Sequence, residues 1–409
     1  MFFCFCVSIL IFAPAAAFPD CEHGYLEVEI IGNSKTKTRT IKRLAKLEGE
    51  CVPPEGVNAE RIRQDLLNSH LFSRVEVEVN AEKDVTRVRI IVKDKWTIIP
   101  VPVLYTSGEQ SGGGMMILES NLLGRKKMLM GGVFFGTRGN RYEGIYIDDA
   151  VWGSKWILVI RPLFMERILL RYDDEKEVYA YKDDFNLIFG ILGYKITDHI
   201  APAVGLVYRY RDLSETEDYP APRNERSTAG AMCNLKLSYT KFVDYYDKGF
   251  SGVFTFEHSL REFGADTIYG HFQATFEFVY PISIVLSRTF LEGGWSVGED
   301  VGITNYYRLG GEYGYRGIPE TGLWVSDYVV FSQQFEQVLY RMKLGTFTIA
   351  EFSDNVFTHE DDPVRIYYSL GVGLRAYLKE IAIPAVGVDA GYSLRNGAWH
   401  ISAYVGKVF

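Results

Sequence analysis

The segment IYYSLGVGLRAYL (residues 366–378) alternates between two kinds of side chain. Its even-numbered positions are apolar or aromatic, whereas its odd-numbered positions carry Tyr, Ser, Gly and a single Arg. Successive side chains of a β-strand point to opposite faces of the sheet, so the pattern predicts a strand with one apolar and one polar face. The polar face lacks the Lys and Glu residues that are typical of a soluble β-sandwich, and this favours a transmembrane β-barrel whose apolar face is outward.

The same alternation recurs through residues 98–409, for example at 204–210. We therefore predict a mostly-β fold, an antiparallel barrel of about sixteen strands, with fourteen or eighteen as alternatives; an even number returns both ends of the barrel to one side of the membrane. The tail YVGKVF (404–409), with Gly406 and a terminal Phe409, is typical of a closing barrel strand. Composition agrees, because 14% of the residues are aromatic and no later apolar run is long enough for a membrane-spanning helix.

Residues 1–17 are expected to form a secretory signal peptide, because the apolar run at 2–12 precedes small residues that suit cleavage after Ala17. Cys21 and Cys51 then remain near the new amino terminus, and an oxidising compartment would let them form a disulfide. Two free thiols are the alternative, since the sequence does not give the distance between the two residues.

Residues 22–96 have a different pattern, in which alternating segments flank two segments with helical periodicity. Apolar residues at 38–47 and 59–69 recur every three or four positions, which predicts two helices, and Asn58 can cap the second helix. Alternation predicts strands at 26–30, 75–79 and 85–92. The order strand, helix, helix, strand, strand indicates a small α+β domain ahead of the barrel.

This small domain resembles a POTRA domain, the periplasmic module of the BamA superfamily of outer-membrane assembly barrels. The segments VEIIGN (28–33) and LFSRVEV (71–77) carry the resemblance. The barrel contains YRLGGEYGYRGI (307–318), which is similar to the sixth-loop signature of that superfamily. Arg316 and Gly317 match the Arg-Gly pair of the signature, so the resemblance implies that this loop folds into the lumen and contacts the inner wall.

Gly310 and Gly311 match the approach to that pair, whereas Ile318 stands where the family usually carries an aromatic residue. A buried Arg is costly unless a carboxylate or several carbonyl groups bind its planar guanidinium. Three acidic residues of the expected wall are candidates for this contact, and the sequence does not choose among them: Glu336, Glu351 and Asp354.

Pro100 and Pro102 lie in the first expected strand of the barrel. Residues two apart direct their backbone nitrogens to the same edge, and proline has no N–H, so two ladder donors are missing along one edge. If that edge meets the last strand, the closing seam of the barrel is weak, as a lateral gate requires. The alternative is that the prolines stiffen the hinge between the small domain and the barrel.

The resemblance implies a role in protein insertion or translocation at the bacterial outer membrane. It places the small domain in the periplasm, lipids around the barrel, and unfolded outer-membrane proteins or periplasmic proteins as partners. A porin-like or structural barrel that forms a homo-oligomeric ring is the other hypothesis, and the single POTRA-like domain favours it. Two-partner secretion would require more such domains and a plug helix.

The net charge of −8 argues against nucleic acid as a partner. We find no catalytic motif or metal-ligand spacing and expect neither an enzyme nor a cofactor or metal.

Overall fold

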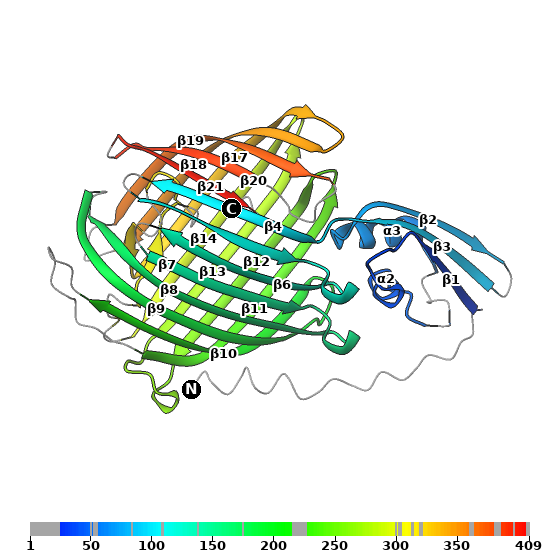
Figure 1. The fold of residues 1–409 in the computed structure, drawn as a ribbon, viewed down its shortest axis with the longest axis horizontal. Helices are drawn as coiled ribbons and strands as arrows, with labels where there is room; N and C mark the ends of the chain where they lie inside the picture. Colours follow the sequence, from blue (N-terminus) through cyan, green and yellow to red (C-terminus); the bar gives the residue numbers. More distant parts are fainter. Residues whose placement is uncertain are drawn as a thin grey trace.

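A computed structural model of the chain describes residues 25–49, 51, 56–82, 85–107, 110–136, 139–173, 176–214, 227–298, 301, 305–311, 315–318, 322–359, 364–379, 386–395 and 397–405. Figure 1 shows a small part made of helices and strands, in blue, and a barrel whose tilted strands run from cyan to red. The expected signal peptide, Cys21, Gly406 and Phe409 lie outside the described residues. Cys51 is described and forms a disulfide.

The small part, called here the N-terminal module, packs two helices against a three-stranded sheet. Its elements are β1 (Tyr25–Ile31), α2 (Thr38–Leu44), α3 (Ala59–Asn68), β2 (Phe72–Ala81) and β3 (Val85–Asp94). The central strand β3 is parallel to β1 and antiparallel to β2. The Asn58 side chain accepts a hydrogen bond from the backbone nitrogen of Arg61 and thereby caps α3. Ile41, Ile62 and Ile90 are fully buried between the helices and the sheet.

The barrel is one antiparallel sheet of sixteen strands, which confirms the predicted number. Consecutive strands pair with each other, except that β14 pairs with β17 across an intervening connection. The strands are β4 (Ile98–Ser107), β5 (Gln110–Glu119), β6 (Lys127–Gly136), β7 (Gly139–Asp148), β8 (Trp156–Asp173), β9 (Lys176–Tyr194), β10 (Ile200–Ser214), β11 (Ser227–Val243), β12 (Tyr246–Ser259), β13 (Gly270–Ile282), β14 (Val285–Val297), β17 (Asp327–Arg341), β18 (Gly345–His359), β19 (Arg365–Leu378), β20 (Val386–Ser393) and β21 (Trp399–Val405). In the described connections between strands there are three single 3-10 turns: η2 (Leu122–Gly124), η3 (Val151–Gly153) and η4 (Arg261–Phe263).

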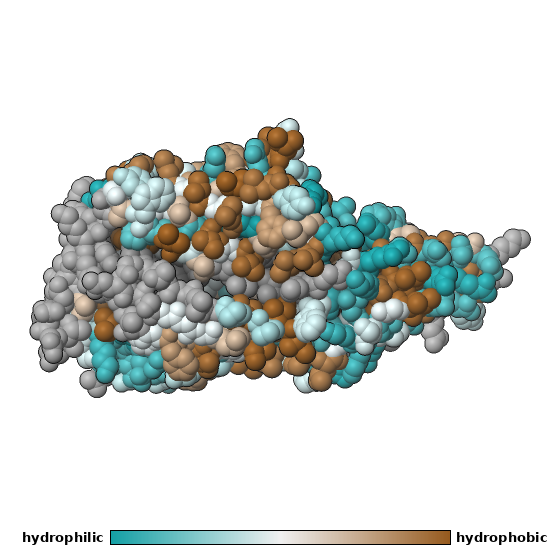
Figure 2. All heavy atoms as spheres, turned by 45° about the horizontal axis from the view of Figure 1, so that its top comes forward, coloured by the Kyte–Doolittle hydropathy of each residue, from teal (hydrophilic) through white to brown (hydrophobic). Residues whose placement is uncertain are grey.

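Alternation along each strand separates the outer face of the barrel from the lumen. In β19, Leu370 and Leu374 are 50% and 56% exposed on the outer face, whereas Ser369 and Arg375 are buried on the inner face. Figure 2 shows apolar residues spread over the outer surface of the barrel, which suits contact with lipid acyl chains. In the described part of the chain, no helix combines the length and the apolar character needed to cross a membrane.

The connection between β14 and β17, called here the lumen loop, folds back inside the barrel. It contains a short hairpin of β15 (Tyr307–Leu309) and β16 (Leu323–Val325). Ile318 of the loop is fully buried and belongs to one apolar cluster with Val330 and Val356, which point inward from β17 and β18. The lumen therefore holds a packed loop on this side of the barrel.

The N-terminal module lies against the turns at one end of the barrel (Figure 1). The backbone nitrogen of Lys37, beside α2, donates to the carbonyl oxygen of Gly124 at 3.0 Å. Near the end of β11, the Phe242 carbonyl accepts a hydrogen bond from Gln64 Nε2, and the Phe242 nitrogen donates to Asn68 Oδ1, both at 2.9 Å. Each helix of the module therefore holds a different part of the barrel end.

A third contact between module and barrel is an ion pair. Lys46 Nζ donates to Asp198 Oδ2 in the turn between β9 and β10, at 2.5 Å. This hydrogen bond lowers the pKa of the Asp198 carboxyl, so the pair is ionised at neutral pH. Three separate turns thus fix the orientation of the module.

A barrel whose strands are joined by backbone hydrogen bonds unfolds as a unit, because its backbone groups have no other partners inside a membrane. We expect the full chain in detergent to migrate faster on a gel without heating than after boiling, with circular dichroism typical of β-sheet. A monomer that stays soluble without detergent would contradict a membrane barrel.

Candidate functional site

Arg316 lies in the lumen and is bound by a carboxylate of the barrel wall. Its Nε donates to Oδ2 of Asp354 at 2.9 Å, and its Nη2 donates to Oδ1 of the same residue at 2.7 Å. The backbone nitrogen of Arg316 also donates to Asp354 Oδ2, at 3.0 Å. Two parallel hydrogen bonds between a guanidinium and a carboxylate are strong and directional. Both residues are buried, at 8% and 1% exposure, so little water competes for these bonds.

The other donors of Arg316 meet three more wall residues. Nη1 donates to Gln334 Oε1 at 3.1 Å and to Asp389 Oδ2 at 3.3 Å, while Nη2 donates to Ser332 Oγ at 3.1 Å. Arg375 pairs with the second oxygen of Asp389, at 2.6 Å. All five guanidinium N–H groups therefore have acceptors, supplied by β17, β18 and β20.

Glycines make room for this contact. A Cβ atom on Gly391 of β20 would lie 2.3 Å from the carbonyl oxygen of Arg316, and one on Gly317 would lie 2.5 Å from the Ser369 side chain. Phe352 lies beneath the guanidinium, with its ring centroid 3.4 Å from Arg316 Cζ. The Arg-Gly pair needs glycine at its second position because the loop backbone lies directly on the wall.

The residues before the Arg-Gly pair shape the turn of the loop. Gly310 and Gly311 have φ angles of +131° and +60°, which L side chains rarely adopt. The Gly311 nitrogen donates to the carbonyl oxygen of Ile318 at 2.9 Å. Ile318 packs with the buried residues Leu309 and Tyr315, so an aliphatic side chain fills the position at which the resembling family usually has an aromatic one.

The structure does not bring the other two candidate carboxylates to Arg316. Glu336 is buried in the lumen, but its Oε2 accepts hydrogen bonds from Arg288 Nε at 3.2 Å and Tyr377 Oη at 3.0 Å. Glu351 is exposed on the outer face of β18. Since neighbouring side chains of a strand alternate between faces, Glu351 and the inward-facing residues of β18 lie on opposite sides of the wall.

Three members of the site are not recognisable from the sequence pattern alone: Asp389, Arg375 and Gln334. The available signal for Asp389 was its position between Gly387 and Gly391 on the inner face of β20. Its partner lies 73 residues away along the chain, and periodicity carries no information on such contacts. Among the described residues, no group of three His, Cys, Asp or Glu side chains could hold a metal ion.

A second candidate site is the seam at which the barrel closes. The two end strands of the sheet, β4 and β21, lie side by side (Figure 1). Among the described residues no β-ladder joins these two strands, whereas a ladder joins every other neighbouring pair.

The prolines of β4 face this seam. Beside the β4–β5 ladder, the Ser120 nitrogen donates to the Thr97 carbonyl oxygen at 3.1 Å. Hydrogen-bonded pairs alternate along an antiparallel ladder, so odd-numbered residues of β4 bond to β5. Pro100 and Pro102 therefore direct their nitrogens to the opposite edge, toward β21, where no N–H can be offered.

Removal of Arg316 should weaken the barrel, because it leaves the buried carboxylate of Asp354 without its guanidinium partner and takes one of two such partners from Asp389. Loss of one member of a buried pair costs about 3–5 kcal/mol. The matched control is Arg341→Ala, because Arg341 is half-exposed and pairs with Asp244 at 2.5 Å, and such surface pairs contribute about 0–1 kcal/mol. We expect Arg316→Ala, but not Arg341→Ala, to lower the temperature at which the folded gel band disappears. Equal temperatures for both variants and the parent would show that Arg316 does not anchor the loop.

No protein-family model and no curated protein matches this chain. Solved structures similar to it include BamA from Haemophilus ducreyi lacking POTRA domains 1–3, with a TM-score of 0.55, 15% identity, and 93% of this chain and 83% of that chain covered. CdiB from Escherichia coli has a TM-score of 0.64 and 15% identity, with 94% of this chain and 76% of that chain covered. CdiB from Acinetobacter baumannii has a TM-score of 0.64 and 13% identity, with 94% of this chain and 74% of that chain covered. The chain therefore has the same fold as the barrels of BamA and CdiB.

Proposed function

We propose that this chain inserts or translocates proteins at the bacterial outer membrane by opening between β4 and β21. The observation that carries the proposal is that no β-ladder joins these strands in the described part of the chain. The apolar outer face supports a membrane location, and the likeness in fold to BamA and CdiB supports membership of that superfamily. The N-terminal module would then lie in the periplasm, where unfolded client proteins arrive.

Opening at this seam would break fewer hydrogen bonds than opening elsewhere. A backbone hydrogen bond contributes about 1 kcal/mol net in water, and losing one costs more where lipid supplies no substitute. Pro100 and Pro102 remove two donors from the β4 edge. The sheet should therefore separate first between β4 and β21.

An opened seam would offer two strand edges in the membrane. Unpaired N–H and C=O groups are costly in lipid, and an added strand satisfies them. A client strand that pairs with β4 or β21 would therefore be stabilised as it enters the bilayer. Hydrogen bonds gained by the client drive this step, so the mechanism requires no nucleotide or cofactor.

The lumen loop supports this mechanism by holding one side of the seam. Arg316 is bound to Asp389 of β20, and β20 pairs with β21 along its whole length. Gly391 of β20 also lies against the loop backbone. Opening would then displace β4 from a β20–β21 hairpin that the loop keeps in place.

Disulfides across the seam test the proposal. Ala403 of β21 and three residues of β4 face outward, so cysteines there can meet: Ile98, Pro100 and Pro102. Each β4 position would be combined with Ala403→Cys in a Cys233→Ser background, because Cys233 of β11 would otherwise offer a further thiol. We expect that the parent speeds the folding of an unfolded client barrel in liposomes, that oxidation of a seam pair abolishes the acceleration, and that reduction restores it.

The control is a disulfide inside an intact ladder. Val388 of β20 is paired directly with Ala403 of β21 and also faces outward. A Val388→Cys, Ala403→Cys variant should cross-link without loss of acceleration. Acceleration that persists with the seam locked would refute lateral opening, and a parent that never accelerates folding would refute insertion.

A homo-oligomeric ring, porin-like or structural, is the second candidate, because the outer face carries a polar stripe. On the outer face of β14 and β17, Thr289 Oγ1 and Gln333 Oε1 are hydrogen-bonded at 2.7 Å, and Gln333 Nε2 also donates to Ser287 Oγ at 3.0 Å. Glu351 is exposed on the same face, in the middle of β18. A carboxylate on a lipid-facing surface is unfavourable, so a second copy of the chain that covers the stripe would stabilise it.

Reversal of charge at the stripe tests this candidate. If copies meet there, native mass spectrometry in detergent should show an oligomer for the parent and mainly monomer for Glu351→Arg. Glu262→Arg is the matched control, because Glu262 is exposed in the turn between β12 and β13 and should leave the oligomer intact. A monomeric parent, or an oligomer that survives Glu351→Arg, would exclude a ring built on this stripe.

A further inference from the structure

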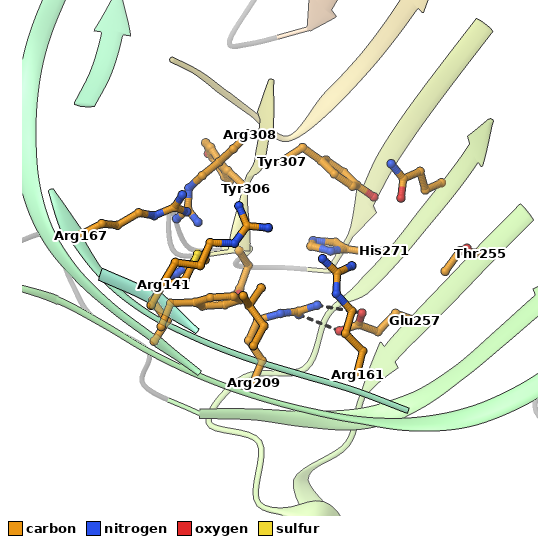
Figure 3. Close-up of a pocket in the computed structure, with 16 residues that line it drawn as sticks. Arg141, Arg161, Arg167, Arg209, Thr255, Glu257, His271, Tyr306, Tyr307 and Arg308 are labelled. Atoms are coloured by element: carbon orange, nitrogen blue, oxygen red, sulfur yellow. Dashed lines mark hydrogen bonds and ion pairs between the residues drawn. The ribbon is translucent and has the colours of Figure 1, made fainter. Parts of the chain in front are cut away.

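A chamber of about 320 Å³ lies in the lumen, on the side opposite the Arg316 contact. One side is formed by residues of β7, β8, β9, β10, β12 and β13, and the other by residues 305–308 of the lumen loop. Figure 3 shows charged side chains that extend into the space from both sides. Its volume is within the range of small-molecule sites, about 300–1,000 Å³.

The chamber is lined mainly by positive charge. Six arginines line it: Arg141, Arg161, Arg167, Arg209, Arg211 and Arg308. Among the described residues, three carboxylates form ion pairs with these arginines: Glu143, Asp183 and Glu257. Glu292 of β14 is not one of the lining residues, and its Oε1 accepts a hydrogen bond from Nε2 of the lining residue Gln273 at 3.0 Å. The described lining therefore has more guanidinium groups than carboxylates to neutralise them.

Three of these arginines are bound to carboxylates of the barrel wall. Arg209 is bound to both oxygens of Glu257, at 2.8 and 3.0 Å (dashed in Figure 3). Arg167 and Arg211 share the two oxygens of the buried Asp183, at 3.3 and 2.9 Å. These bonds fix the guanidinium groups in place and so build a rigid, positively charged floor.

Arg308, on β15 of the lumen loop, is held differently. Its Nε and Nη2 atoms are buried and have no hydrogen-bond partner among the described residues. Its guanidinium lies over Trp324, 4.5 Å from the ring centroid, and faces the like charges of Arg211 and Arg167, which Asp183 offsets only in part. A buried donor without an acceptor is unfavourable, so the arrangement lacks a negatively charged group at this point.

Arg161, on β8, is the least tightly paired arginine of the wall. It lies 3.8 Å from Glu143, whose Oε2 accepts a hydrogen bond from Arg141 at 2.8 Å. The guanidinium of Arg161 points into the chamber in Figure 3. Arg161 and Arg308 thus reach the space from the wall and from the loop, respectively.

We propose that the chamber binds an anion of the phosphate class, held between Arg308 of the loop and Arg161 of the wall. The forked guanidinium group matches pairs of oxygens on one centre, which phosphate offers and chloride does not. Several positive charges around one space favour a polyvalent anion over a single carboxylate. The phosphate could belong to a free solute or to a lipid headgroup, and the experiment separates these sources.

A bound anion would fasten the lumen loop at a second point. The loop is already tied through Arg316 to β17, β18 and β20, and through Trp324 to an apolar cluster with Tyr181 and Leu213 on β9 and β10. An anion on Arg308 would add a charged link to the same wall. This inference is independent of the insertase proposal, because it concerns occupancy of the lumen and not movement of the seam.

Calorimetric titration of the full chain in detergent tests the proposal. Pyrophosphate would be added at constant ionic strength, with chloride as the reference salt and a short-chain phosphatidic acid as the lipid arm. We expect saturable binding of pyrophosphate or of the lipid, and the arm that binds identifies the source. Arg308→Gln or Arg161→Gln should weaken binding about tenfold or more, as expected for the loss of a charged hydrogen-bond donor.

Two further variants separate binding from folding. Arg308→Lys keeps the charge without the fork and should bind with intermediate affinity, whereas Arg341→Gln, outside the chamber, should bind like the parent. Each variant must be folded in chloride, as shown by the same heat-modifiable gel band as the parent. If Arg308→Gln does not fold, the affinity of Arg161→Gln for the anion tests the proposal. Absence of saturable binding in both arms, or binding unchanged in the variants that fold, would overturn the proposal.

Discussion

The charge of Arg316 determines where the lumen loop lies. Asp354, Asp389 and Gln334 point inward from three different strands, and a single guanidinium reaches all of them only when the loop is inside the barrel. The apolar cluster around Ile318 adds burial, but burial is non-directional and would allow several positions of the loop. Directional, charge-assisted bonds in a site with little water select one position, because each alternative leaves a buried charge without a partner.

The two ends of the loop then have different surroundings. Near Arg316 the wall supplies as many acceptors as the guanidinium has donors, and glycines such as Gly391 allow the backbones to touch. Near Arg308 the described wall supplies mainly further arginines. Because Arg308 and Arg316 belong to the same lumen loop, the contact that holds Arg316 also places Arg308 among like charges. The N–H donors of Arg316 therefore all have acceptors, whereas Nε and Nη2 of Arg308 have none among the described residues, and an anion would supply them.

Periodicity predicts much of the barrel, because it records which face of a strand meets lipid. The number of strands and the outward direction of Leu370 in β19 follow from it. It does not choose between Glu351 and Asp354, although residues three apart in a strand must lie on opposite faces. Both faces of β18 carry polar residues, Asn355 outside and Thr348 inside, so the pattern alone does not show which face is the lumen. The edge to which Pro100 turns depends on which pairs of the β4–β5 ladder are hydrogen-bonded, and this too is a property of two strands together.

The contacts inside the barrel are distributed unevenly around its wall. Strands β17, β18 and β20 are tied together by the ionic contacts of Arg316, and β8, β9 and β10 by those of Asp183. The inner face of β4 instead presents the apolar residues Ile99 and Val101. Apolar contacts tolerate sliding and separation better than directional ion pairs do. At the seam, therefore, both the backbone ladder and the charged cross-links of the lumen are missing from the described structure, and motion of the wall should concentrate where these two constraints are absent together.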